Sequence, residues 1–390
     1  MSSIRKIAFV SPRFAKENTV GGAETLMKNL AVRLVSEGVK VTFLSTCAVN
    51  HFTWENELPA GESVVDGINL IRFPVDEDRS VDTFLRIQAQ ISAYQKVSPE
   101  EEQRWIDNSV NSSALCKYLT ENIAAFERII VGPYLFGLSY NVSRIMPEKT
   151  ILLPCLHDEG FAYTGLIEDM FKSTRSSIFN SVPEQKLAHK LYSLPNSYGT
   201  VVGIVMDPFE LPTKSELKGV DKYIMYSGRR ESAKNTPLLC NYLNVFRRRT
   251  GRDIKLVLTG SGPIEAPPQL LPHILDLGFV SKPEMHRVMS GAVAFCHPSV
   301  NESLGIVLLE SWLSGTPVLV NAQCAATRYL CETSNGGLWF SSYPEFVEEL
   351  VLLIENDTLR DKMAASGRDY VLRDYSESAV MSRLMKAIEA

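Results

Sequence analysis

The feature that most constrains this chain is a pattern that occurs twice, in which a short apolar strand, a glycine-containing turn, an amphipathic helix and another strand follow one another. Near the N-terminus the run Lys6–Ser11 leads to the Gly21-Gly22 turn, a helical pattern over Ala23–Ser36 and a second run at Val39–Ser45. This order predicts a parallel sheet covered by helices. Sheets of this kind bind ligands beyond the carboxyl ends of their strands.

The pattern restarts in the second half of the chain. Further strands of the first series are expected at Ile68–Phe73, Arg128–Val131, Thr150–Leu153 and Ile178–Asn180. The second series has strands at Lys222–Ser227, Ile254–Thr259, Ala292–Cys296 and Thr316–Val320, with helices at Pro237–Arg249, Glu284–Ser290 and Leu304–Ser314. We therefore expect an N-terminal domain at 1–206, a linker at 207–221, a C-terminal domain at 222–375 and a final helix at 376–390 that returns to the N-terminal domain.

Composition excludes several classes of protein. A net charge of −5 argues against the basic surface that nucleic-acid binding requires. No apolar run approaches the ~20 residues of a membrane span, and the first run, Ile7–Val10, is too short for a signal peptide. The seven cysteines are odd in number and lack metal-site spacing, which indicates reduced thiols. These features predict a cytoplasmic protein, at most peripheral to the inner face of a membrane.

The strongest chemical signal is the segment Asn301–Glu310. Glu302 and Glu310 stand eight residues apart and flank a glycine and an apolar helix start. On a continuous helix this separation is about 12 Å along the axis, which is too far for an acid/base pair but suits two parts of one extended ligand. The amides of residues 304–306 would lie at a helix N-terminus, which attracts phosphate. Taken alone, such a pair is more often an exposed glutamate and an ordinary helix residue.

A second signal follows the predicted strand Lys222–Ser227. Gly228 permits a tight turn. Arg229 and Lys234 could then neutralise a diphosphate, whose negative charge grows as it departs. Taken alone, such a loop is more often ordinary surface charge.

Together these segments resemble the C-terminal half of retaining glycosyltransferases of the GT-B fold, family 4, also called glycosyl transferases group 1. The motifs that carry the resemblance are Gly228-Arg229 with Lys234, Leu258–Pro263, Gly278–Ser281, His297–Ser299, Glu302 with Glu310, and Ser314–Val318. They cover most of 222–375. The resemblance implies two Rossmann-like parallel α/β domains that face each other across a donor-binding cleft. In the N-terminal half the match is thinner: Gly21–Glu24 resembles the family's glycine-rich loop and Leu156–Asp158 its histidine near the donor sugar.

The resemblance also implies roles for single residues. The expected catalytic group is His157 beside the reacting sugar, Glu302 on the sugar hydroxyls, and Arg229 and Lys234 on the diphosphate. The expected donor-binding residues are Gly21, Gly22, Gly228, Val280 (nucleobase), Ser303, Leu304, Gly305, Ile306 and Glu310 (ribose). Three positions depart from the family pattern: Leu304 replaces an aromatic residue, Asn235 replaces a glycine, and Arg230 is an additional arginine without an assigned role.

The function implied is metal-independent, cofactor-free hexosyl transfer with retention, from a nucleotide sugar (UDP-glucose in the first instance) to a saccharide or lipid-linked acceptor of polysaccharide or glycolipid biosynthesis. The alternatives are a nucleotide-sugar epimerase, a sugar phosphorylase and a non-catalytic nucleotide-sugar-binding protein. The acidic triplet Asp76–Asp78 is expected to be an exposed loop rather than a metal site.

The acceptor is expected to bind the N-terminal domain, within residues 48–115 and 132–145. The aromatic candidates there are Trp54, Trp105, Tyr134 and Phe136, and each could equally be a core residue. A helix over Phe84–Val97 could lie near a lipid-linked acceptor. The roles of Asp158 and Glu159 stay open.

Overall fold

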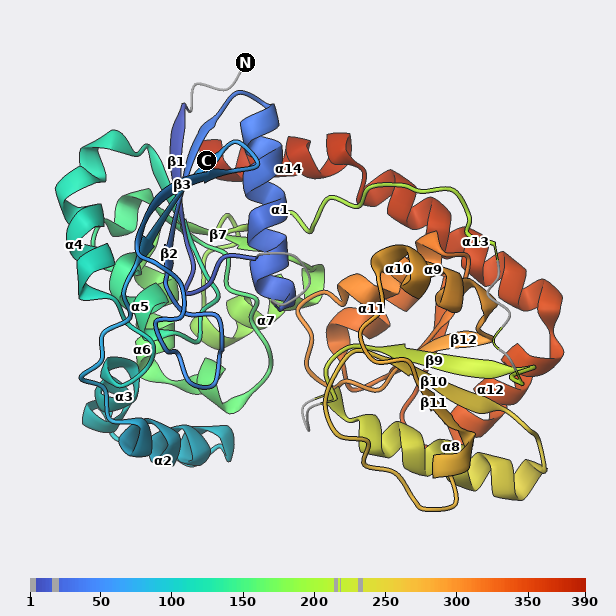
Figure 1. Cartoon of the computed structure of the whole chain (residues 1–390). Helices are drawn as coiled ribbons and strands as arrows, with labels where there is room; N and C mark the ends of the chain where they lie inside the picture. The colour runs from blue at the N-terminus through green and yellow to red at the C-terminus, as the bar shows by residue number, and fades with distance from the viewer. Residues whose placement is uncertain (1–4, 16–20, 214–216, 218, 231–233) are drawn as a thin grey trace. The chain divides into compact units, whose positions relative to one another are not determined.

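The computed structural model describes residues 5–15, 21–213, 217, 219–230 and 234–390, and the chain divides into two compact units (Figure 1). The first unit comprises residues 1–205 and 378–390, and the second comprises residues 206–377. Positions 214–216 and 218 of the expected linker, and 231–233 of the loop that follows Gly228, lie outside the described residues. Each unit is built around its own sheet.

The first unit contains an eight-stranded sheet in the order β3-β4-β2-β1-β5-β6-β7-β8. Its strands are β1 (Lys6–Val10), β2 (Lys40–Thr46), β3 (Gly61–Val65), β4 (Ile68–Phe73), β5 (Arg128–Val131), β6 (Thr150–Leu152), β7 (Ser176–Phe179) and β8 (Thr200–Val201). Neighbouring strands pair in parallel except β3 and β4, which are antiparallel. Parallel strands end at the same edge, so the loops that follow β1, β5 and β6 share one edge of this sheet.

Helices flank this sheet in Figure 1. They are α1 (Gly22–Ser36), α2 (Val81–Ser92), α3 (Pro99–Asp107), α4 (Ser113–Asn122), α5 (Gly137–Ser143), α6 (Gly165–Ser173), α7 (Val182–Tyr192) and α14 (Glu377–Glu389), with short 3-10 turns including η3 (Gly160–Tyr163). The α14 helix is joined to the unit by hydrogen bonds: Arg383 Nε donates to the Val202 carbonyl (3.1 Å), and Arg128 Nε donates to the Ile388 carbonyl (2.8 Å).

The second unit contains a six-stranded sheet in the order β11-β10-β9-β12-β13-β14, and every neighbouring pair is parallel. Its strands are β9 (Tyr223–Ser227), β10 (Lys255–Thr259), β11 (Ile274–Asp276), β12 (Ala294–His297), β13 (Val318–Asn321) and β14 (Gly337–Phe340). The strand order reverses between β9 and β12. Such a switch point opens a crevice at the carboxyl ends of the two strands, because the helices that follow them lie on opposite faces of the sheet.

The helices of the second unit are α8 (Thr236–Thr250), α9 (Lys282–Gly291), α10 (Ile306–Leu313), α11 (Ala325–Ser334), α12 (Tyr343–Glu355) and α13 (Asp357–Asp374). In Figure 1, α8 and α12 lie on one side of the sheet and α9 and α10 on the other. The side chains of Leu243 and Phe246 (α8) and of Phe346 and Leu350 (α12) join the buried core against the sheet. This apolar packing holds the loops at the strand ends in fixed positions.

The strand predictions agree with the structure to within two residues, and two helix predictions were wrong in their bounds. The helix expected from Leu304 begins at Ile306, because Gly305 has a φ of +91° that no helix accommodates. The helix expected over Phe84–Val97 begins at Val81 and ends at Ser92, since Tyr94 adopts a φ of +55°. Within the described residues no helix is both long and apolar enough to cross a membrane.

Candidate functional site

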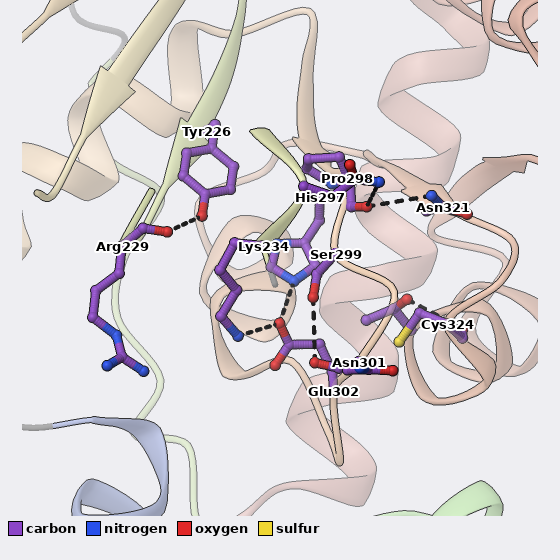
Figure 2. Close-up of polar contacts among 12 residues, drawn as sticks. Tyr226, Arg229, Lys234, His297, Pro298, Ser299, Asn301, Glu302, Asn321 and Cys324 are labelled. Atoms are coloured by element: carbon purple, nitrogen blue, oxygen red, sulfur yellow. Dashed lines mark hydrogen bonds and ion pairs between the residues drawn. The ribbon is translucent and has the colours of Figure 1, made fainter. Parts of the chain in front are cut away.

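The loop after β9, the end of β12 and the loop after β12 bring together a lysine, a histidine and a glutamate at the switch point of the second sheet. Lys234 Nζ lies 2.6 Å from Glu302 Oε1, and His297 Nε2 lies 3.0 Å from the same oxygen (Figure 2). The sequence separates Lys234 from Glu302 by 68 positions. They meet because β9 and β12 are adjacent parallel strands, so their following loops emerge side by side.

The cluster keeps the Glu302 carboxylate ionised. Burial alone would raise the pKa of this carboxyl, but the Lys234 ammonium and the His297 ring outweigh burial and lower the pKa well below its usual range. The Glu302 side chain is 14% exposed, so it remains partly accessible to a ligand. An ionised, fixed carboxylate is a strong acceptor for hydroxyl groups of a ligand.

His297 is the residue of this cluster to which the sequence assigned no role. Its ring is 5% exposed and lies nearly parallel to the Tyr226 ring, with centroids 6.3 Å apart. The next residue, Pro298, accepts through its carbonyl from the Asn235 side chain (3.4 Å) and the Asn321 side chain (3.3 Å). The Tyr226 ring beside it and the hydrogen bonds to the carbonyl of the next residue therefore restrict the position of His297, which in turn orients Glu302. In the sequence, the feature that could have indicated a role for His297 is its place at the end of an apolar strand, five residues before Glu302.

Asn235 has a structural explanation for replacing the family's glycine. It precedes α8 with φ +55° and ψ +30°, in the left-handed region. Glycine enters this region without strain, and asparagine is one of the few other residues that visits it readily. The substitution thus preserves the backbone that positions Lys234.

Arg230 ties three loops of the second unit together. Its guanidinium makes a two-point contact with the Asp276 carboxylate (3.3 and 3.0 Å), and its Nε donates to the Gly262 carbonyl (2.8 Å). The loops approach closely because they are lined by glycine: a Cβ on Gly260 would lie 2.2 Å from the Gly228 carbonyl oxygen. The additional arginine therefore braces the loop that carries Arg229.

We expect Arg230→Ala to lower the free energy of unfolding by about 2 kcal/mol, because it leaves the Gly262 carbonyl and the Asp276 carboxylate without their charged donor. Urea titration of the variant would measure this change. Arg248→Ala, which removes an exposed arginine of α8, is the matched control. Equal stability of Arg230→Ala and the parent protein would contradict a bracing role.

The second glutamate lies on α10, whereas Glu302 precedes the helix. The continuous-helix distance expected between the two carboxylates therefore does not apply. The Glu310 side chain is buried, which raises the pKa of its carboxyl, and Lys282 Nζ, 3.7 Å from Oε1, partly opposes this effect. Lys282 begins α9 two residues after Val280, so the loop expected to meet the nucleobase lies near Glu310.

Arg229 is the predicted catalytic residue of this unit that lies apart from the cluster. Its carbonyl accepts from the Tyr226 hydroxyl at 2.6 Å, which fixes the backbone, and its side chain is exposed. Figure 2 shows the guanidinium directed away from Glu302. The other predicted residues, Ser303, Leu304, Gly305 and Ile306, form the chain segment between Glu302 and the first turn of α10.

In the first unit, the predicted histidine follows β6. His157 Nδ1 lies 3.4 Å from Glu159 Oε1, and the same oxygen accepts from the Tyr134 hydroxyl at 2.8 Å. Sequence reasoning missed Glu184, a fully buried first-turn residue of α7 that accepts the backbone N–H of Leu156 at 2.6 Å. Glu184 thereby holds the segment that carries His157.

Gly21 and Gly22 stand at the start of α1 in the first unit. Gly21 precedes the helix in an extended conformation, and Gly22 is its first residue. Two residues later, Glu24 forms a buried ion pair with Arg13, whose guanidinium lies 2.5 Å away and also donates to the Val49 carbonyl. This pair fixes the start of α1 against the loop after β1.

The aromatic residues proposed for acceptor contact are mostly core residues. Trp54, Trp105 and Tyr134 are 6%, 1% and 1% exposed. Phe136 packs its ring against Trp54. Trp105 and Tyr134 face the apolar core, and burial of large rings is the expected result of their size. The acidic triplet Asp76–Asp78 lies in a loop, with Glu77 and Asp78 exposed, and Asp76 accepts the backbone N–H of Ser113 (2.9 Å) at the start of α4.

Comparison with known proteins adds a family match in the second unit. The family model described as "Glycosyl transferases group 1" matches residues 208–370. The phosphatidyl-myo-inositol mannosyltransferase of Mycobacterium leprae is 34% identical over 143 residues, which are 35% of this chain and 38% of that relative. The match thus spans well under half of the relative's length.

Solved structures match nearly the whole chain. A sucrose-phosphate synthase from Thermosynechococcus elongatus has a TM-score of 0.70 and 14% identity, with 98% of each chain covered. The Anabaena protein HepE, solved in complex with UDP and glucose, has a TM-score of 0.70 and 13% identity, with 99% of this chain and 100% of that chain covered. At such identities the likeness shows the fold, two parallel α/β sheets as in GT-B glycosyltransferases.

Proposed function

Since the chain belongs, through residues 208–370, to the glycosyl transferases group 1 family, we propose that it transfers a hexose from a nucleotide sugar to a saccharide or lipid-linked acceptor. The observation that carries the proposal is the Lys234–Glu302–His297 cluster at the switch point of the second sheet. It places an ionised carboxylate and a cation where an open α/β sheet binds its ligand.

Each part of the donor has a matching group in the second unit. The Glu302 carboxylate accepts hydrogen bonds from the sugar hydroxyls, and Lys234 lies beside it as the positive charge for the phosphates. The start of α10, immediately after Gly305, presents backbone N–H groups to the diphosphate. Glu310 takes the ribose hydroxyls, near the loop at Val280 that meets the nucleobase.

The reaction proposed is hexosyl transfer with retention of the anomeric configuration, assisted by positively charged side chains. As the bond between sugar and diphosphate breaks, negative charge grows on the phosphate and is stabilised by Lys234 and Arg229. The departing phosphate oxygen takes the proton of the acceptor hydroxyl on the same face of the sugar. Glu302 fixes the sugar ring during this step.

The finer identities draw support from the relatives. The Anabaena structure holds UDP and glucose, which favours UDP-glucose as the donor. The Mycobacterium leprae relative is named as a phosphatidyl-myo-inositol mannosyltransferase, which favours a lipid-linked acceptor and keeps mannose as a second sugar to test.

Calorimetric titration with UDP, GDP and ADP, followed by the matching nucleotide sugars, tests the donor site. We expect one diphosphate to bind selectively, and Arg229→Ala to weaken it by about tenfold through loss of a charge-assisted contact. Arg248→Ala is the control, since that arginine is exposed on α8. If none of the three diphosphates bound, the result would contradict the proposed transfer from a nucleotide sugar. Release of an altered nucleotide sugar without any acceptor would favour an epimerase instead.

A further inference from the structure

Two neighbouring tyrosines of the first unit leave most of their side chains exposed. Tyr94 is 62% exposed and Tyr163 is 54% exposed. Their ring centroids lie 5.8 Å apart and the ring planes are inclined by 62°. Tyrosine offers a large apolar contact surface that loses little conformational entropy on binding, so an exposed pair of this kind suits ligand contact.

Backbone packing brings the two tyrosines close together. Tyr94 stands two residues after the end of α2, and Tyr163 is the last residue of η3. The two segments approach at Gly160, where a Cβ would lie 1.9 Å from the Ile91 carbonyl oxygen. Only glycine permits that approach. The pair is therefore a product of backbone packing and not of two flexible side chains that happen to touch.

Both hydroxyl groups are bonded to one residue, Asp158. The Tyr163 hydroxyl donates to Asp158 Oδ1 at 2.6 Å, and the Tyr94 hydroxyl donates to the Asp158 carbonyl at 3.2 Å. The bond to Asp158 raises the pKa of Tyr163 to about 12, so its hydroxyl stays protonated at neutral pH. With their polar ends occupied, the two side chains present apolar ring surface to a ligand.

A pyranose ring has the complementary surface, with C–H groups on its faces and hydroxyl groups around its rim. The aromatic pair fits a C–H face, and the exposed Asp158 carboxylate fits the rim hydroxyls. Asp158 and Glu159 both carry negative charge, which disfavours a phosphorylated sugar at this place. Asp158 directly follows His157, so a sugar bound here would lie next to the predicted catalytic histidine.

We propose that Tyr94, Tyr163 and Asp158 form a subsite for one neutral hexopyranose unit of the acceptor. Its role in transfer rests on the proposed function, whereas sugar binding by the aromatic pair does not require the donor. The same sugar unit could belong to a soluble saccharide or to the head of a glycolipid.

Saturation-transfer NMR on the full chain tests the subsite directly. The probes are methyl β-D-glucopyranoside, octyl β-D-glucopyranoside below its micelle concentration, and glucose 6-phosphate. We expect ring-proton signals from both glucosides and a much weaker signal from the phosphate. In the variant that combines Tyr94→Asn and Tyr163→Ala, glucoside affinity should fall about tenfold. Asparagine is chosen at position 94 because it tolerates the positive φ.

Two further variants make the outcome specific. Phe52→Ala removes another exposed aromatic side chain, 71% exposed, and should leave the signals unchanged. Tyr163→Phe keeps the ring but loses its bond to Asp158, and should retain most of the glucoside signal. The ratio of octyl to methyl glucoside affinity separates a lipid-linked source from a soluble one. Signals that are absent from the parent protein, or equal in the parent and the double variant, would overturn the proposal.

UDP titration of the same samples separates this proposal from the proposed function. Sugar binding without any nucleotide binding would support the subsite and count against transfer. Nucleotide binding without sugar signals would overturn the subsite alone.

Discussion

Glu302→Gln is expected to lower the turnover of sugar transfer by about 10²- to 10³-fold, the usual effect of removing one preorganised electrostatic contact. The amide carries no charge and can no longer accept from Lys234, His297 and a sugar hydroxyl with equal strength. UDP affinity should stay within about threefold of the parent protein, because the proposed partner of Glu302 is the sugar and not the nucleotide. Initial rates of UDP release and calorimetric UDP titration measure the two quantities.

The matched control for this change is Glu265→Gln, which removes an exposed carboxylate of the same unit. It should leave both turnover and UDP affinity unaltered. A Glu302→Gln protein with parental turnover would show that the cluster is structural. A Glu302→Gln protein with parental turnover per bound donor but much weaker UDP binding would show that Glu302 contacts the nucleotide and not the sugar.

Lys234→Met is expected to impair both catalysis and stability. The variant leaves the buried Glu302 carboxylate paired with His297 but without the lysine, and it loses the cation proposed for the phosphates. At pH 7 the free energy of unfolding should fall by about 2 kcal/mol, less than for a fully buried pair because the Lys234 side chain is 23% exposed. Turnover should fall by about 10²-fold or more.

The pH dependence of this loss identifies its cause. In the parent protein the pKa of Glu302 is lowered on folding, so its contribution to stability is complete above the unfolded value of about 4.3 and is lost as the pH falls below it. Without Lys234, one of the two groups that oppose burial is lost, so the pKa of Glu302 rises above its value in the parent protein. As the pH falls, the contribution of Glu302 is then lost at a higher pH than in the parent protein.

The stability difference between Lys234→Met and the parent protein should therefore be smaller near pH 3 than at pH 7, because the contribution of Glu302 is lost as the pH falls towards its low folded pKa. Urea titrations at the two pH values measure it. Lys362→Met, at an exposed position of α13, provides the control. A difference that does not change with pH would mean that Lys234 contributes through packing rather than through its charge.

Local sequence patterns predicted the inner strands of the fold because a strand buried in a parallel sheet has a short, apolar sequence. Runs such as Arg128–Val131 and Ile68–Phe73 are apolar, short and bounded by turns, and they became strands with those bounds. No strand was predicted for β3, β8, β11 or β14, which lie at the edges of the two sheets. An edge strand needs a partner for its hydrogen bonds but not an apolar sequence, so periodicity does not detect it.

The candidate site was predicted as a set of residues but not as an arrangement. Motif order singled out Lys234 and Glu302, yet nothing local says that the lysine contacts that carboxylate. The same limit explains Arg230, whose partners lie on two other loops, and the exposed tyrosines, which differ from buried Tyr134 only in their surroundings.

The sequence by itself thus determined two α/β units, the inner strands of their sheets, several of their helices, and a set of charged residues proposed to bind a donor. These follow from hydrophobic periodicity and from glycines at tight turns, which act within a few residues of each other. Only the tertiary structure decided which loops meet, because β9 and β12 became neighbours through strand order and not through sequence distance. It also decided which aromatic rings stay exposed, since burial depends on what the rest of the chain places against each ring.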